Sequence, residues 1–153
     1  ILLLETMNSI IETEACLTAL KNFDLPIWVS FVLKDEYHLP SGDSLSDALE
    51  MIRRYSVECI MLNCNSLCRT VMAVENIVDN WPGKWGVCPN IGIGEPSSDG
   101  NICHYEKMDC FISAMEKIIE LGPSIMGTCC GSSAYHTSKL FEVRKQYDFV
   151  SGI

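Results

Sequence analysis

The sequence has few basic residues and no long apolar segment. Lys and Arg total 11 against 20 Asp and Glu, which gives a net charge of -9. A surface of this sign repels phosphate groups, so we expect no nucleic-acid partner. The apolar runs near residues 1–4 and 27–29 are far shorter than the roughly 20 residues that a membrane-spanning helix needs, so we expect no membrane partner either.

The sequence also has no recognisable targeting signal and no cysteine spacing typical of secreted, disulfide-rich proteins. The first five residues carry no basic region and no small-residue cleavage site, so we predict no signal peptide. Nine cysteines are many for 153 residues, but their odd number and wide spacing argue against a secreted disulfide scaffold. The sequence therefore predicts a cytoplasmic protein whose thiols are reduced, some of them buried and some functional.

What the chain does contain is a regular alternation of strand and helix patterns, without low-complexity segments or a domain linker. Short apolar runs rich in β-branched residues alternate with segments of helical periodicity. Five strand–helix units in succession predict an α/β fold with a parallel sheet. The expected strands are 1–5, 27–33, 59–64, 85–90 and 124–129, and the expected helices are 11–22, 44–55, 68–80, 109–121 and 137–147.

Two parallel architectures compete, the doubly wound sheet and the (β/α)8 barrel. No Gly-rich phosphate loop follows the first strand, and polar or sulfur-containing residues fall at the carboxyl ends of several strands, where a barrel assembles its active site. These residues are Glu5, Ser30, Asn63, Cys64, Asn90, Cys129 and Cys130. The pattern favours the barrel.

A complete barrel needs eight units and about 250 residues, whereas this chain has five units and begins within a strand. We therefore expect residues 1–153 to be the carboxyl-terminal part of a partial TIM barrel whose amino-terminal units are missing. The two open edges of such a sheet predict self-association.

The cysteines at two strand ends form the most specific pattern. Cys64 and the adjacent pair Cys129 and Cys130 are too far apart for a local zinc finger, but strand ends of a barrel meet at one mouth. Three thiolates on Zn²⁺ would leave the fourth tetrahedral position open, as in a catalytic site. Alternatively, these cysteines are packing residues, or Cys129 and Cys130 are a redox pair.

With these motifs the sequence resembles the homocysteine S-methyltransferase family of zinc-binding barrels. Gly127-Thr-Cys-Cys-Gly-Ser132 resembles the family's Gly-Gly-Cys-Cys-Gly-Thr signature, and Asn63-Cys64 resembles its earlier Asn-Cys. Weaker similarities follow in chain order across nearly the whole sequence. They are Leu4-Glu5-Thr6 with Glu14-Ala15, Pro26-Ile-Trp-Val-Ser-Phe31, Ser41-Gly42, and Pro89-Asn90 with Gly92.

The resemblance implies a chemistry and a set of site residues. The family's zinc would be held by Cys64, Cys129 and Cys130, and a methyl group would pass from a small donor to the homocysteine thiolate, giving methionine. S-methylmethionine and S-adenosylmethionine are the favoured donors, while betaine and folate or cobalamin routes stay open. Glu5 would bind the substrate ammonium group, as the family's glutamate does, unless it is a solvent-facing strand end. Ser30 and Asn90 are candidates for the substrate pocket or for turns.

The chain also departs from the family pattern. Thr128 replaces the signature's second glycine, Ala134-Tyr135 replaces the usual Pro-Glu, and Cys88 stands where an aromatic residue is common. His136 falls where the family often has His, and either a place beside the metal ligands or a role at a helix start fits it. A catalytically incompetent remnant or an interaction module of the same fold is therefore the alternative to an active enzyme.

Overall fold

The computed structural model describes residues 1–94, 97–99, 102 and 104–151, with side chains through 148. Five strands alternate with five helices along the chain. The strands are β1 (Leu2–Met7), β2 (Ile27–Phe31), β3 (Val57–Ser66), β4 (Lys84–Asn90) and β5 (Ile125–Met126). The helices are α1 (Ile10–Leu20), α2 (Leu45–Ile52), α3 (Leu67–Asn80), α4 (Met108–Ile119) and α5 (Ala134–Ser151). The predicted α/β class is confirmed.

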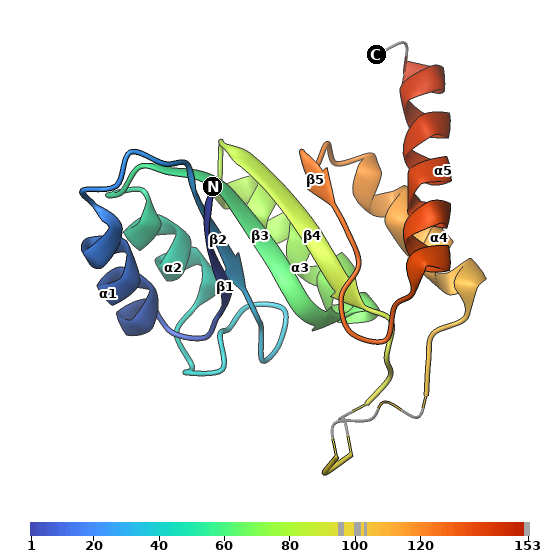
Figure 1. Ribbon diagram of the computed structural model, residues 1–153, viewed down its shortest axis with the longest axis horizontal. Coiled ribbons are helices and arrows are strands. Elements are labelled where there is room, and N and C mark those ends of the chain that lie inside the picture. The colour runs from blue at the N-terminus through green and yellow to red at the C-terminus, as the bar shows by residue number, and fades with distance from the viewer. Residues whose placement is uncertain (95–96, 100–101, 103, 152–153) are drawn as a thin grey trace.

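The strands form one parallel sheet in the order β1-β2-β3-β4-β5, which is their order in the sequence. A doubly wound sheet requires the strand order to reverse, which places helices on both faces. With sequential order and right-handed crossovers, every helix falls on the same face, as in the wall of a barrel. Figure 1 shows this sheet extending from α1 and α2 at one end to α4 and α5 at the other. The strand order therefore favours the barrel architecture over the doubly wound sheet.

The core lies between the sheet and its helices. Alternate strand residues such as Val29, Phe31, Leu62 and Val87 are fully buried in one cluster with apolar residues of the helices. Because strand side chains alternate between faces, Ser30, Asn63 and Cys88 point to the other, helix-free face. The polar residues predicted at the strand ends are thus separated from the core that supports them.

Serine side chains start three of the helices. Ser9, Ser44 and Ser66 each accept a hydrogen bond from the backbone N–H three residues later, which satisfies a donor that the first helical turn leaves free. At Ser44, the first residue of the helix predicted over 44–55, this bond comes from the backbone N–H of Asp47 at 3.0 Å.

The predicted bounds of the fifth strand are wrong. The strand was expected over 124–129 but covers only Ile125–Met126, because the backbone then turns toward β4. In the first strand Leu3 is 46% exposed and Glu5 is exposed, because β1 is an edge strand that helices cover on one side only.

None of the helices in the described ranges is both long enough and apolar enough to cross a membrane.

Candidate metal centre

Three cysteines meet at the carboxyl end of the sheet. Cys64 lies near the end of β3, while Cys129 and Cys130 lie in the turn after β5, and their Sγ atoms are all within 4.8 Å of one another. The Sγ atoms of Cys64 and Cys129 are 3.1 Å apart, and those of Cys129 and Cys130 are 3.9 Å apart. Within the described residues, this is the one group of three or more Cys, His, Asp or Glu side chains that could hold a metal ion. The tertiary structure brings together the three thiols that the sequence singled out.

Backbone irregularity places the Cys64 thiol. The pairing of β3 with β4 shifts register between Asn63 and Ser66, and within this irregularity Cys64 has a φ angle of 56°. A side chain other than glycine in this left-handed region costs about 1–2 kcal/mol. The strand packing and hydrogen bonds around Cys64 offset this cost.

The two adjacent cysteines are fixed by backbone bonds to the end of β4. The backbone N–H of Cys129 donates to the Pro89 carbonyl at 2.9 Å, and the Cys130 carbonyl accepts from the N–H of Ile91 at 2.9 Å. Gly131 then turns the chain at a φ angle of 79°, and a Cβ there would lie 2.8 Å from the backbone nitrogen of Gly92. Only glycine satisfies both conditions, so the glycine after the cysteine pair has a structural cause.

Asn90 connects the two halves of the thiol cluster. Its Nδ2 donates to the Cys64 carbonyl at 3.1 Å, and its Oδ1 accepts from the backbone N–H of Cys130 at 3.2 Å. One carboxamide therefore spans from β3 to the turn after β5. In this structure the Asn90 side chain thus forms hydrogen bonds with the backbone of the thiol-bearing residues.

The electrostatics of the cluster favour a bound cation. Burial, followed by the neighbouring thiols of Cys129 and Cys130, raises the pKa of the Cys64 thiol to about 12. Burial and Cys129 also raise the pKa of the Cys130 thiol. Thiolates this close repel one another, and a soft divalent ion removes that repulsion. The donor set, three thiols with an exposed side at Cys130, fits a zinc site with an open position.

Glu5 lies on the exposed end of β1, on the same side of the sheet as the thiols. Both sites act on the Cys88 thiol: burial first, and then the charges of Cys129 and Glu5, raise the pKa of this thiol to about 11. No ion pair in the described part of the chain involves Glu5. Its carboxylate is thus free to accept a cationic group near the metal centre.

Ser30 is 1% exposed, and its hydroxyl donates to the Asn63 Oδ1 at 2.5 Å. The Asn63 Nδ2 in turn donates to the Thr6 Oγ1 at 2.7 Å. Thr6 follows Glu5 directly and has a φ angle of 61°, which is rare for a β-branched residue. This chain of bonds joins the ends of β1, β2 and β3 beneath the site.

Sequence reasoning did not assign these positioning roles to Thr6 and Asn63. The available signal was the motif context, because Thr6 follows Glu5 and Asn63 precedes Cys64. It did not reveal which hydrogen bonds the two side chains would form.

His136 lies in the first turn of α5. Its Nδ1 accepts from the backbone N–H of Ser133 at 3.2 Å, and its ring lies edge-on to Phe111 at 5.7 Å between centroids. It is not part of the group of ligand atoms formed by the three cysteines. Of the two interpretations left open by the sequence, the structure supports the helix start.

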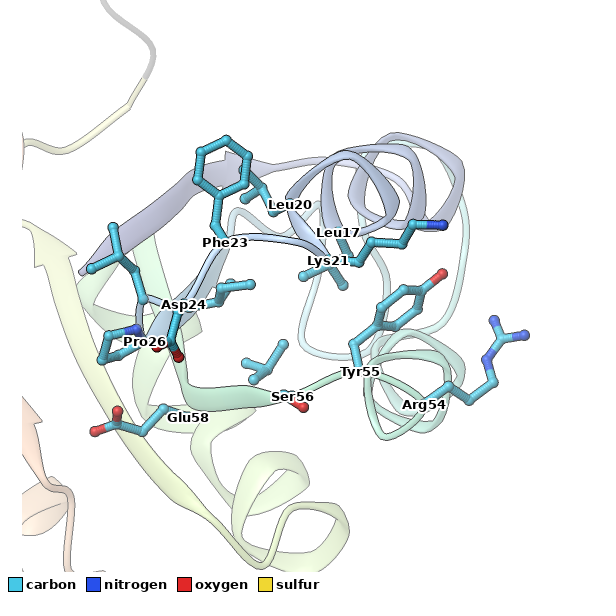
Figure 2. Close-up of a pocket in the computed structure, with 13 residues that line it drawn as sticks. Leu17, Leu20, Lys21, Phe23, Asp24, Pro26, Arg54, Tyr55, Ser56 and Glu58 are labelled. Carbon is cyan, nitrogen blue, oxygen red and sulfur yellow. The ribbon is translucent and has the colours of Figure 1, made fainter.

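One cavity in the described chain is remote from this chemistry. It has a volume of about 720 Å³ and lies between the carboxyl ends of α1 and α2 and the beginnings of β2 and β3. Figure 2 shows Lys21, Tyr55 and Arg54 on one side of it and Asp24 and Glu58 on the other. Barrel active sites lie at the opposite, carboxyl ends of the strands, so this cavity is not part of the candidate site.

Comparison with known proteins agrees with this geometry. The sequence model of the homocysteine S-methyltransferase family matches residues 1–143. Homocysteine S-methyltransferase 1 of Brassica oleracea var. italica is 27% identical in an alignment 146 residues long, which covers 85% of this chain and 41% of that protein.

Two crystal structures of the homocysteine methyltransferase MmuM from Escherichia coli share the fold. The apo form is 23% identical with a TM-score of 0.76, and covers 94% of this chain and 49% of its own. The metallated form is 23% identical with a TM-score of 0.76, and covers 92% of this chain and 43% of its own. The chain therefore spans less than half the length of each of these relatives.

Proposed function

Because the chain belongs to the homocysteine S-methyltransferase family, we propose that it carries the metal- and homocysteine-binding part of an enzyme that methylates homocysteine to methionine. The observation that supports this most is the convergence of Cys64, Cys129 and Cys130 within 4.8 Å at the carboxyl end of the sheet. We also propose that residues 1–153 are one portion of a longer barrel domain, since they match less than half of each relative.

The three cysteines would hold Zn²⁺, which when bound acts as a Lewis acid and lowers the pKa of a substrate thiol. The chain's own residues bind and orient around that centre. Glu5 would pair with the ammonium group of homocysteine, since its exposed carboxylate is in no ion pair of the described chain. Asn90 holds the backbone of Cys64 and Cys130, so that the thiols keep their spacing without a ligand.

The remaining site residues would shape the substrate pocket rather than bind the metal. Ser30 and Asn63 would fix the floor of the pocket and the end of β1, and hence the direction of Glu5. Asn90 would also line the pocket beside the metal, because this residue is only partly buried. A small methyl donor such as S-methylmethionine or S-adenosylmethionine would approach from the exposed side of Cys130. The free thiols of the described cysteines support a reducing, cytoplasmic setting.

The test combines metal content with activity. Purified chain, and a version extended at its amino terminus, should bind one zinc ion, and the extended version should form methionine from homocysteine with one of a panel of donors. Cys64→Ser should abolish both properties, whereas Cys16→Ser, which removes a half-buried thiol from α1, should leave them unchanged. An extended chain that binds zinc but makes no methionine with any donor would identify a non-catalytic member of the fold.

A thiol redox function is the second candidate, because the Cys64 and Cys129 Sγ atoms are only 3.1 Å apart. This pair is closer than the adjacent cysteines considered from the sequence. A metal-free protein with a reversible Cys64–Cys129 disulfide, found by peptide mass mapping, would favour this function over methyl transfer.

A further inference from the structure

A second group of sulfur-containing side chains lies outside the metal centre, on the helical layer. Cys68 and Met72 of α3 and Cys110 of α4 line a cleft of about 250 Å³ between these two helices. Both cysteines are free and exposed, and Met72 is 50% exposed. Three sulfur atoms therefore have access to one small, solvent-open volume.

Helix geometry places these side chains on facing surfaces. Cys68 and Met72 are four residues apart on α3, so they lie one above the other on the same side of the helix. Cys110 and Ala114 have the same relation on α4, which packs against α3. The small Ala114 side chain leaves the cleft open opposite Met72, and Leu67 and Val71 form its apolar lining.

The cleft shares no residue with the metal centre. Both of its walls belong to the described chain, and its lining lies mainly in the first turns of α3 and α4, on the helical layer, without Cys64, Cys129 or Cys130. Additional βα units at either edge of the sheet would not cover a groove between two consecutive helices. The cleft therefore keeps its exposure whether or not the barrel is complete.

The ligand chemistry of the cleft selects a soft ion. Zinc sites use thiolate, imidazole and carboxylate ligands, whereas thiolates combined with a thioether favour Cu(I). The carboxylate at the rim, Glu106, is a hard ligand that contributes little to binding of such an ion. We propose that the cleft between α3 and α4 binds one Cu(I) ion through Cys68, Cys110 and Met72.

Binding would require small movements of exposed side chains. The ligand atoms of Cys68, Cys110 and Glu106 are not already grouped as those of the Cys64 cluster are. Binding through both thiols requires rotation about χ1 of Cys68 and Cys110, and their exposure leaves this rotation free of the core. Each thiol releases its proton to solvent as the copper–sulfur bond forms.

The test is an anaerobic titration of the full chain with Cu(I) against a chromophoric Cu(I) chelator. The triple variant Cys64→Ser, Cys129→Ser, Cys130→Ser removes the other thiol cluster and should still bind one Cu(I). In that background, Cys68→Ser or Cys110→Ser should weaken binding by more than about tenfold, as loss of a metal-site residue commonly does. Met72→Leu, which keeps the volume but removes the sulfur, should have a smaller effect in the same direction.

The matched control is Cys16→Ser in the same background, which removes a thiol of α1 and should leave Cu(I) affinity unchanged. Far-UV circular dichroism establishes that each variant is folded. The proposal is overturned if the triple variant does not compete for Cu(I), or if Cys68→Ser and Cys110→Ser bind as tightly as their background.

Discussion

At the scale of single residues, the thiol cluster depends on amide side chains as much as on sulfur. Asn90 bonds to the backbone of Cys64 and Cys130, while Asn63 joins Ser30 to Thr6 beneath the site. Two residues near these bonds, Thr6 and Cys64, have positive φ angles that an isolated chain would avoid. The amide side chains therefore stabilise a backbone conformation that contacts between the thiols alone would not stabilise.

Replacing Asn90 tests this role. We expect Asn90→Ala to weaken zinc binding about 10–100-fold, because residues that orient metal ligands have effects of this size. Zinc affinity measured by competition with a fluorescent chelator gives the comparison, and Asn80→Ala at the end of α3 is the control. Unchanged zinc affinity together with a raised KM for homocysteine would instead make Asn90 a pocket residue only.

The hydrogen bonds of Asp43 at the start of α1 predict that the stability of the folded chain depends on pH. Its carboxylate accepts hydrogen bonds from the backbone N–H of Ile10 and from the Ser41 hydroxyl, both at 2.8 Å. The bond from Ile10 and then that from Ser41 lower the pKa of Asp43 below its ordinary value of 3.8. The stabilisation is thus complete above that value and is lost as the pH falls through the lower, folded-state pKa.

The measurement is thermal unfolding of the unmodified chain and of Asp43→Asn from pH 7 to pH 3. We expect the variant to melt at a lower temperature at pH 7, and the difference to shrink at the acidic end of the series. Asp24→Asn, in the turn before β2, serves as the control. A difference in melting temperature that does not change with pH would show that the charge of Asp43 has no part in its effect.

At the scale of elements, the short strand β5 determines where the cysteine pair lies. It pairs with β4 at only two positions, Gly86 with Ile125 and Val87 with Met126. Glycine permits this close approach, since a Cβ at Gly86 would lie 2.5 Å from the Ile125 carbonyl oxygen. A similar contact occurs just beyond the strand, where a Cβ at Gly127 would lie 2.7 Å from the Cys88 Sγ.

The contact between Gly127 and Cys88 can be tested by a double-mutant cycle. Gly127→Ala should destabilise the chain by about 1–3 kcal/mol, because the added methyl group overpacks the junction of β4 and β5. Combining it with Cys88→Ala removes the clashing sulfur and should recover part of that loss. The free energy of unfolding in urea is measured for both single variants and the pair, and strictly additive effects would contradict the packing explanation.

At the scale of the whole molecule, the sheet has helices on one face and unpaired edges at β1 and β5 within the described chain. Unpaired backbone N–H and C=O groups at an edge are templates for pairing with another chain. At this edge the apolar side chains of Ile1, just before β1, and of Leu3, within it, are also 64% and 46% exposed. This combination favours association through β1.

Concentration-dependent sedimentation tests this prediction. The chain should self-associate at high concentration, and Leu3→Lys should shift it toward the monomer, because a charged edge residue opposes strand pairing. Ile11→Lys is the control, since Ile11 is 81% exposed but lies on α1. A monomer at all concentrations, or an equal effect of both variants, would exclude association through the β1 edge.

Local patterns in the sequence were sufficient to predict the alternation of strands and helices and to identify the three thiol residues. Apolar periodicity depends on local side-chain spacing, so helix cores such as 68–80 and 109–119 and the strand 85–90 were predictable. The cysteine pair between glycines is likewise a local pattern. Its chemistry could be inferred because few soft ligands other than thiols suit zinc.

How those residues come together depends on contacts that local patterns do not encode. Sequential strand order, which distinguishes the barrel wall from the doubly wound sheet, is a long-range property. The left-handed backbone at Cys64, the two-residue length of β5 and the bridge formed by Asn90 also arise from contacts between distant strands. Such contacts have no periodic signature in the sequence, because their energies depend on which strands become neighbours.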